Sequence, residues 1–192
     1  MKKRKIFRTV IVVLIMILLV ASPALAEATR TEWTEQNTTC DYYCSLGEGQ
    51  CESYSANGKI MHGRGFVQYI RALRFDPNSP NLDLDPEWHG WTTSIVNFDL
   101  NLETGHGTSW GTFVREYDLK DGTFEGTWSG QINEFVFSGK LVGHGTGELE
   151  GQLVKGWVNN FLNEDLPLDL PCEPDELFGS VNNGYILDPH GE

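Results

Sequence analysis

Three basic residues each lie in a run of residues that alternates with the period of a β-strand. The chain of 192 residues is acidic overall. Side chains alternate between the two faces of a strand, and Arg71, Arg115 and Lys155 each share a face with glycines and large apolar residues. If that face lines the inside of a barrel, each charge needs a partner or a ligand, because removing it from water is costly. We therefore expect a lumen mouth that binds a small anionic or amphipathic molecule.

Aromatic side chains accompany these charges. Tyr69 and Tyr117 lie two residues from Arg71 and Arg115 on the same faces, and Trp128 projects inward from a neighbouring run. The predicted ligand-binding residues are therefore Arg71, Arg115, Lys155, Tyr69, Tyr117 and Trp128. An alternative stays open, in which the three charges lie at strand ends, reach solvent and pair with the surplus acids.

Three His-Gly pairs invite comparison with a catalytic zinc site, in which three histidines and a water bind the ion. His62, His106 and His144 fall on the face opposite the glycines, however, and alternate strands lie about 9–10 Å apart, so these rings do not converge. The loop at residues 76–87 offers acidic and amide oxygens to calcium, but prolines interrupt its spacing and it lacks an EF-hand glycine. The sequence therefore favours no metal site and no cofactor.

No pairing of a nucleophile with a base stands out in the chain. There is no Gly-x-Ser-x-Gly motif, no phosphate-binding loop and no Cys-His pairing outside the cysteine-rich segment. Glu125, Glu148 and Glu150 fall on outer faces, which disfavours a buried carboxylate pair. The residues leave open whether the protein is an enzyme.

The elements that must position these residues are β-strands. Residues 105–157 contain GHGTSWGTFVREYD, GTFEGTWSGQI and GKLVGHGTGELEGQLVKGW, where glycines, threonines and large apolar residues recur with a period of two. One face combines glycine with bulky apolar groups, as barrel interiors do, and the same rule makes strands of residues 58–75 and 91–102. The predicted inward set includes Met61, Gly63, Gly65, Val67, Tyr69, Leu73, Phe75, Val96, Phe98, Leu100, Leu102, Phe113, Phe124, Trp128, Ile132, Leu141, Leu149 and Leu153.

These patterns predict an all-β fold, a single antiparallel up-and-down β-barrel of about eight strands at residues 58–161. Residues 27–57 form a cysteine-containing N-terminal segment with at most one short strand. Residues 162–192 form an irregular, acidic and proline-rich C-terminal extension.

Four cysteines indicate disulfide bonds rather than a structural zinc site. Cys40, Cys44 and Cys51 are spaced C-x3-C-x6-C, without the paired C-x2-C spacing of zinc sites, and Cys172 lies far off. Four cysteines allow three pairings. We expect two disulfides, one of them tying the C-terminal tail to the N-terminal segment.

Residues 1–26 have the features of an export signal, with five basic residues, an apolar run and a small-x-small site at Ala24-Leu25-Ala26. We expect cleavage there and an extracellular or cell-envelope location. The formal net charge is −13, and loss of the five basic residues takes it to −18. Nucleic acid and anionic membranes are therefore poor partners. A small molecule is the expected partner of a monomeric or weakly associating protein.

The runs GTFEGTWSGQI and GKLVGHGTGELEGQLVKGW resemble the glycine-rich strands of the allene oxide cyclase-like barrels and, more loosely, of other calycin-type barrels. The resemblance implies a compact barrel of about eight antiparallel strands, with relatives that cyclise or bind hydrophobic small molecules. No catalytic set maps residue by residue from that family onto this chain.

The expected function is binding of a small apolar or amphipathic anion in the lumen of an exported barrel. A second hypothesis is a cofactor-free cyclase or isomerase, in which lumen shape and Tyr or Arg groups steer a reactive substrate. A third is a structural or surface-interaction protein with a filled barrel and exposed Trp91 and Trp110. The volume of the lumen separates the first two hypotheses from the third.

Overall fold

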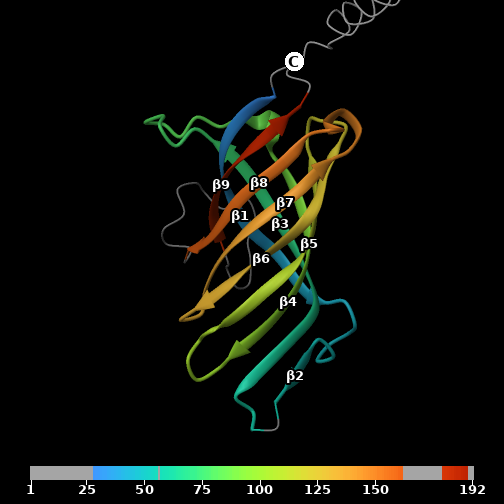
Figure 1. Ribbon diagram of the computed structural model, residues 1–192, viewed down its shortest axis with the longest axis vertical. Coiled ribbons are helices and arrows are strands. Elements are labelled where there is room, and N and C mark those ends of the chain that lie inside the picture. Colours follow the sequence, from blue (N-terminus) through green and yellow to red (C-terminus); the bar gives the residue numbers. More distant parts are fainter. Residues whose placement is uncertain (1–27, 56, 162–178, 190–192) are drawn as a thin grey trace, which may run out of the picture.

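The computed structural model describes residues 28–55, 57–161 and 179–189, which form nine strands and two short 3-10 helices (Figure 1). The strands are β1 (Thr29–Cys44), β2 (Glu52–Tyr54), β3 (Ile60–Phe75), β4 (Gly90–Asn101), β5 (Gly107–Tyr117), β6 (Thr123–Asn133), β7 (Val136–Gly145), β8 (Leu153–Phe161) and β9 (Gly179–Asp188). The 3-10 helices are η1 (Pro86–Trp88) and η2 (Gly147–Leu149).

Eight of these strands close into an antiparallel barrel. The sheet order is β1-β9-β8-β7-β6-β5-β4-β3-β2, and an additional pairing of β1 with β3 joins its ends. The short strand β2 pairs with β3 beyond the barrel wall and extends one rim (Figure 1). The predicted all-β, eight-stranded barrel is confirmed.

The barrel draws strands from both flanking segments, which corrects two predictions. The N-terminal segment was expected to hold at most one short strand, yet β1 spans 16 residues. The C-terminal extension was expected to be irregular, yet β9 pairs with β8 and β1 along its whole length. Both strands carry polar residues on their inner faces, so the apolar alternation does not reveal them. Residues 1–26, Cys172 and most of the acidic extension lie outside the described residues.

A bulge in β3 reverses which side chains face the lumen. The register with β4 shifts between Gly63 and Phe66, and Gly65 adopts a positive φ of 72°, which glycine tolerates. Beyond the bulge Gln68 and Ile70 line the lumen. The side chains predicted to face inward after the bulge therefore face away from the lumen: Val67, Tyr69, Arg71, Leu73 and Phe75.

A turn between β7 and β8 has the same effect on Lys155. The run GKLVGHGTGELEGQLVKGW is two strands, because η2 and the positive-φ residues Gly147 and Gly151 interrupt it. Val154 and Val158 line the lumen after this turn, and Lys155 is exposed on the outside. The predicted inward orientations of Leu153 and Lys155 are therefore wrong, and Leu102, in the β4–β5 turn, is exposed.

In β4, β5 and β6 the alternation holds. Val96, Phe98, Phe113, Arg115 and Trp128 all line the lumen, as the period of two predicts. Glycines on the same face let aromatic rings lie flat against the wall. A Cβ atom at Gly111 would stand 2.8 Å from the Trp128 ring, and one at Gly143 would stand 2.8 Å from the Phe113 ring.

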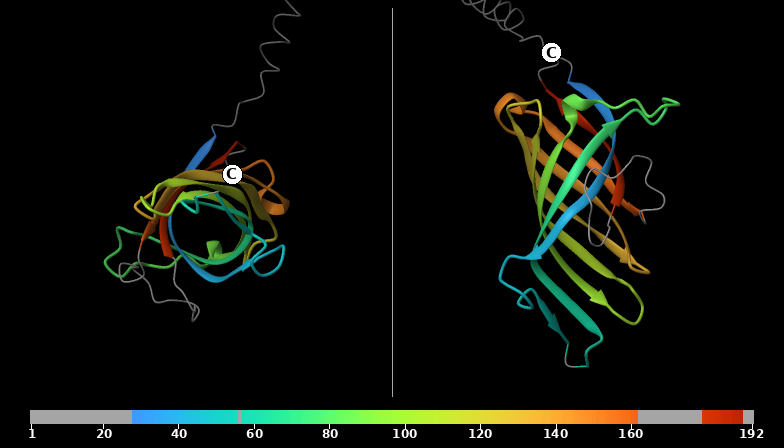
Figure 2. Two further views of the ribbon diagram at one scale, coloured as in Figure 1. Left: turned by 90° about the horizontal axis from the view of Figure 1, so that it is seen from below. Right: turned by 180° about the vertical axis from the view of Figure 1, so that it is seen from behind.

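One end of the barrel is packed and the other is open. The buried apolar cluster consists of Trp33, Phe113, Phe124, Leu149, Val154 and Ile186. Trp88 of η1 packs edge-on against Tyr117 at this end, with ring centroids 5.2 Å apart. Figure 2 (left) looks along the barrel and shows η1 lying within the outline of the strands. Side chains thus close the end that carries η1, whereas β2 lies at the opposite rim.

Candidate functional site

A cavity of about 660 Å³ occupies the lumen, and every strand of the barrel contributes to its lining. This volume lies in the range of sites that hold small molecules, about 300–1,000 Å³. The cavity begins at the packed cluster, with Trp33 and Phe124, and reaches the open rim. At that rim Phe135 lines the cavity although 62% of its surface is exposed.

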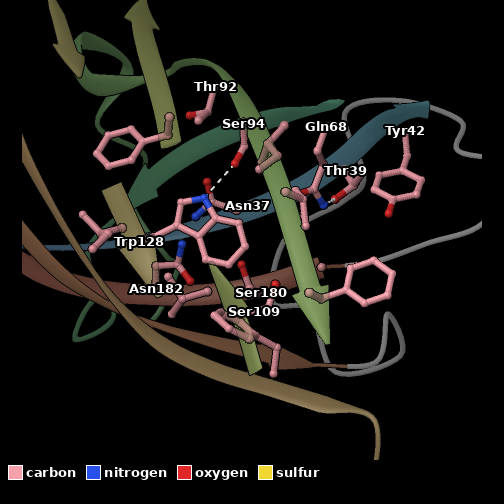
Figure 3. A pocket seen from close by; sticks show the side chains of 18 of the residues that line it. Asn37, Thr39, Tyr42, Gln68, Thr92, Ser94, Ser109, Trp128, Ser180 and Asn182 are labelled. Atoms are coloured by element: carbon pink, nitrogen blue, oxygen red, sulfur yellow. Dashed lines mark hydrogen bonds between the residues drawn. The ribbon is translucent and has the colours of Figure 1, made fainter. Parts of the chain in front are cut away.

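The lumen has two chemically different walls (Figure 3). The apolar wall comes from β6, β7 and β8, whose lining residues are Phe124, Trp128, Ile132, Phe137, Leu141, Val154 and Val158. The polar wall comes from β9, β1, β3, β4 and β5, and its neutral polar residues are Asn37, Thr39, Gln68, Thr92, Ser94, Ser109, Ser180 and Asn182. The same strands also contribute apolar lining residues, which are Trp33, Met61, Ile70, Val96, Phe98, Leu100 and Phe113.

At the deep end of the polar wall, one arginine binds three side chains. Arg115 donates from Nη1 to Glu35 Oε2 at 2.5 Å, from Nη2 to Asn37 Oδ1 at 3.0 Å, and from Nε to Thr92 Oγ1 at 2.8 Å. Asn37 Nδ2 in turn donates to Glu35 Oε1 at 3.0 Å. We call Arg115, Glu35, Asn37 and Thr92 the Arg115 cluster. Because both oxygens of Glu35 are engaged, the cluster fixes the direction of the guanidinium.

The electrostatics of this cluster favour charged side chains. Burial alone would raise the pKa of Glu35, which is 1% exposed, but the charge and hydrogen bond of Arg115 hold that pKa below its ordinary value. Burial alone would lower the pKa of Arg115, but the charge of Glu35 raises it. The pair is therefore ionised at neutral pH.

A second buried arginine, Arg74, lies near the Arg115 cluster. Arg74 is 6% exposed, and its guanidinium lies over the Trp88 ring at 4.3 Å and the Trp33 ring at 5.9 Å. Burial lowers its pKa, against the charge of Glu35, and no described residue accepts a hydrogen bond from Nε. The charge of Asp85 also raises the pKa of Arg74, so two carboxylates, Glu35 and Asp85, oppose the charges of Arg74 and Arg115.

Tyr117 lies between this charged region and the apolar cluster. Its ring packs edge-on against Phe124, with centroids 6.2 Å apart. Burial, as the largest influence, raises the pKa of Tyr117 to about 12, despite the opposing charge of Arg115. The phenol is therefore protonated at neutral pH and presents an O–H group to its surroundings.

Of the six predicted ligand-binding residues, three line the cavity and three do not. Arg115, Tyr117 and Trp128 line it, with Arg115 at the deep end rather than at the mouth. Lys155 is exposed, and Tyr69, with 37% of its surface exposed, lies on the outer face. Arg71 pairs with Asp118 at 2.5 Å and lies over the outer ring of Trp91. Arg71 therefore forms an ion pair outside the lumen, although it lies within β3 and not at a strand end.

Sequence reasoning missed Glu35, Asn37, Arg74 and Asn182. The signal for β1 was the alternation of Trp33, Glu35, Asn37 and Thr39, which places one aromatic and three polar residues on one face. Arg74 joins the inner face only through the bulge in β3. The polar interior of β1 and β9 was thus visible in the sequence but did not resemble a barrel wall.

The three histidines of the His-Gly pairs, His62, His106 and His144, do not line the cavity. His62 Nδ1 contacts Asp99 Oδ1 at 2.6 Å, and His106 Nδ1 contacts Asn133 Oδ1 at 3.2 Å. Within residues 28–55, 57–161 and 179–189, no group of three or more His, Cys, Asp or Glu side chains is arranged to hold a metal ion.

A disulfide joins Cys44, at the end of β1, to Cys51, just before β2. Both strands pair with β3, so the bond holds the β1–β2 loop against the open rim. The second predicted disulfide, which was to involve Cys172, lies outside the described residues and stays a prediction.

Comparison with protein-family models, with curated proteins and with solved structures finds no match to this chain. The closed eight-stranded antiparallel barrel is consistent with a calycin-like architecture. No helix in the described part of the chain is long and apolar enough to span a bilayer.

Proposed function

We propose that the protein binds a small amphipathic molecule in the lumen of its barrel and holds the anionic or polar end of that molecule near the Arg115 cluster. The observation that carries this proposal is the cavity of about 660 Å³, with one apolar wall and a buried arginine at its deep end. A filled barrel with a structural role needs no such volume. The cavity therefore favours binding over a purely structural function.

The preference for an anion rests on the buried charges. Arg115 lines the deep end of the cavity and only 12% of its side chain is exposed, so a negative charge brought close to it is attracted through a medium that screens little. The apolar wall of β6, β7 and β8 supplies contact for a hydrocarbon portion. An amphipathic anion satisfies both surfaces at once.

The proposed place of action is outside the cytoplasm. The Cys44–Cys51 disulfide supports an oxidising compartment, because such bonds persist there. The export-signal features of residues 1–26 agree with an extracellular or cell-envelope location.

The test is a titration with a dansylated undecanoic acid, followed by its fluorescence in an apolar site. We expect saturable binding at one site, and a loss of at least about tenfold in affinity for Val96→Trp, which places an indole in the lumen where the ligand would lie. Arg115→Gln should weaken binding, whereas Lys155→Gln removes the same charge from the outer surface and should not. Equal binding by wild type and a folded Val96→Trp variant contradicts the proposal.

The resemblance to allene oxide cyclase-like barrels supports a second use of the same cavity, in which a reactive polyene or epoxide is cyclised. Tyr117 and Arg115 are the lumen groups that could steer such a substrate. Chromatography of the substrate after incubation decides between the two uses. A new isomer that forms with wild type and not with Arg115→Gln indicates an enzyme, and unchanged substrate indicates a binding protein.

A further inference from the structure

Two buried polar atoms of the cavity lining have no hydrogen-bond partner among the described residues. They are the indole Nε1 of Trp33, a donor, and the amide Oδ1 of Asn182, an acceptor. Each side chain is only 5% exposed, and both line the lumen. In the β1–β9 register Asn182 lies opposite Glu35, so these atoms stand beside the Arg115 cluster. Buried polar groups are normally paired, so the site calls for a complementary ligand group.

The serine hydroxyls of the polar wall present acceptors to the lumen. Ser109 Oγ donates its only hydrogen to the Asn97 carbonyl at 2.8 Å. Ser94 Oγ donates to the Thr112 carbonyl at 3.1 Å and accepts from Trp128 Nε1 at 2.8 Å. The Ser94 and Ser109 hydroxyls have therefore used their hydrogens and can still accept a hydrogen bond from a ligand. Figure 3 labels Ser94, Ser109 and Asn182 among the lining residues and marks the hydrogen bond between Trp128 and Ser94.

We propose that the natural ligand is an amphipathic acid that carries hydroxyl donors along one face. This inference rests on the proposed lumen-binding function. The hydroxyls donate to Ser109 Oγ and Asn182 Oδ1, the opposite apolar face packs against β6, β7 and β8, and the carboxylate accepts from Trp33 Nε1 near Arg115. The lumen has hydrogen-bond donors at its deep end and acceptors along its polar wall. This arrangement favours a hydroxylated acid over a simple fatty acid.

A fully apolar chain with one head group fits this lumen poorly. It would displace water from Ser109 and Asn182 without replacing the hydrogen bonds, which loses affinity. A site built to bond a hydroxyl discriminates strongly against the analogue that lacks it. We therefore expect the hydroxylated acid to bind more tightly than its more hydrophobic analogue, whereas hydrophobicity alone predicts the opposite order.

The test compares cholate with lithocholate, which share one steroid acid skeleton and one charge but differ in the hydroxyls on one face. Isothermal titration with wild type should give at least about tenfold tighter binding of cholate. The double variant Ser109→Ala/Asn182→Leu should lose this preference and bind lithocholate at least as tightly as wild type does. The matched control, Ser129→Ala/Asn183→Leu, makes the same changes on the outer face and should keep the preference.

The outcomes distinguish failure of this inference from failure of the proposed lumen-binding function. Lithocholate binding as tightly as cholate, or a preference that survives in the double variant, overturns the inference. If neither steroid displaces the dansylated acid while that acid binds, the hydroxylated class is wrong and the lumen-binding function stands. If the dansylated acid does not bind either, the proposed function fails and the inference fails with it.

Discussion

Glu35 is the residue on which the charged end of the lumen depends most. Its carboxylate is the only negative partner of Arg115 in the cluster and also faces the charge of Arg74. Removing one member of a buried ion pair leaves the other charge without compensation. Glu35 therefore influences the electrostatic potential that a ligand would meet in the lumen, without having to contact that ligand.

Replacing Glu35 with Gln should lower the free energy of unfolding by about 3–5 kcal/mol, because Arg115 then loses the carboxylate of its buried ion pair. Urea unfolding at neutral pH measures this change. Glu125→Gln, on the exposed outer face of β6, is the matched control and should change stability little. A loss for Glu35→Gln no larger than for the control contradicts the assigned role.

The same residue makes stability depend on pH in a defined direction. The pKa of Glu35 is lower in the folded protein than its ordinary value of 4.5, so this group stabilises the fold fully above that value. The contribution is lost as the pH falls through the folded pKa. Comparing wild type with Glu35→Gln from about pH 7 to about pH 3 should show their difference shrinking only below the ordinary pKa. A constant difference refutes this linkage.

At the scale of elements, the β6–β7 turn at the open rim is conformationally strained. Glu134 and Phe135 both adopt positive φ angles, of 52° and 67°. Two-residue hairpin turns with this geometry favour Asn-Gly, because other side chains are crowded there. The exposed Phe135 ring nevertheless lines the cavity, where it offers an apolar surface to the proposed ligand.

Glu134→Asn/Phe135→Gly should therefore raise the free energy of unfolding by roughly 1 kcal/mol, since the new pair suits the turn. Thermal unfolding in the absence of ligand measures the gain. Affinity for the dansylated acid should fall, because an apolar group leaves the rim. A variant that is both less stable and unchanged in affinity would show that the turn is neither strained nor part of the site.

Sequence periodicity predicted the elements well where the strand is regular and poorly where it slips by one residue. Phe98, Arg115 and Trp128 face the lumen as predicted, because β4, β5 and β6 run without interruption. The Gly65 bulge and the η2 turn each shift the alternation, so the predicted inward positions of Arg71 and Lys155 were wrong. Gly65 belonged to a Gly-x-Gly pattern, which also fits a regular strand.

The two strands that the sequence did not reveal are those that make much of the polar wall. Period-two arguments look for apolar residues on the buried face, whereas β1 and β9 bury Asn37, Ser180 and Asn182 there. Local rules fail most often at functional sites, where other demands act on the residues. The missed strands therefore contribute Asn37, Ser180 and Asn182 to the polar part of the cavity lining.

At the scale of the whole molecule, the barrel is closed at one end by the buried apolar cluster and Trp88, and open at the rim near β2. A ligand held inside contacts strands from the whole circumference, so its binding opposes opening of the barrel anywhere. Stability and binding are linked through the same closed sheet.

A bound ligand at about one hundred times its dissociation constant should add about 2.7 kcal/mol of stability. For a domain of this size the melting temperature should rise by about 5–10 °C. Scanning calorimetry with and without the dansylated acid measures the shift. Val96→Trp should show none, and a similar rise in that variant would place the binding outside the lumen.

Closure through β1 also fixes the order of events in synthesis. Thr29 of β1 pairs with Asp188 of β9. Of the described strands β1 is made first, and one of its edges stays uncovered until β9 has been made. Until then the sheet has open edges that can pair with other chains. A translation product that stops before Gly179 would keep those edges and should aggregate, however complete its first eight strands.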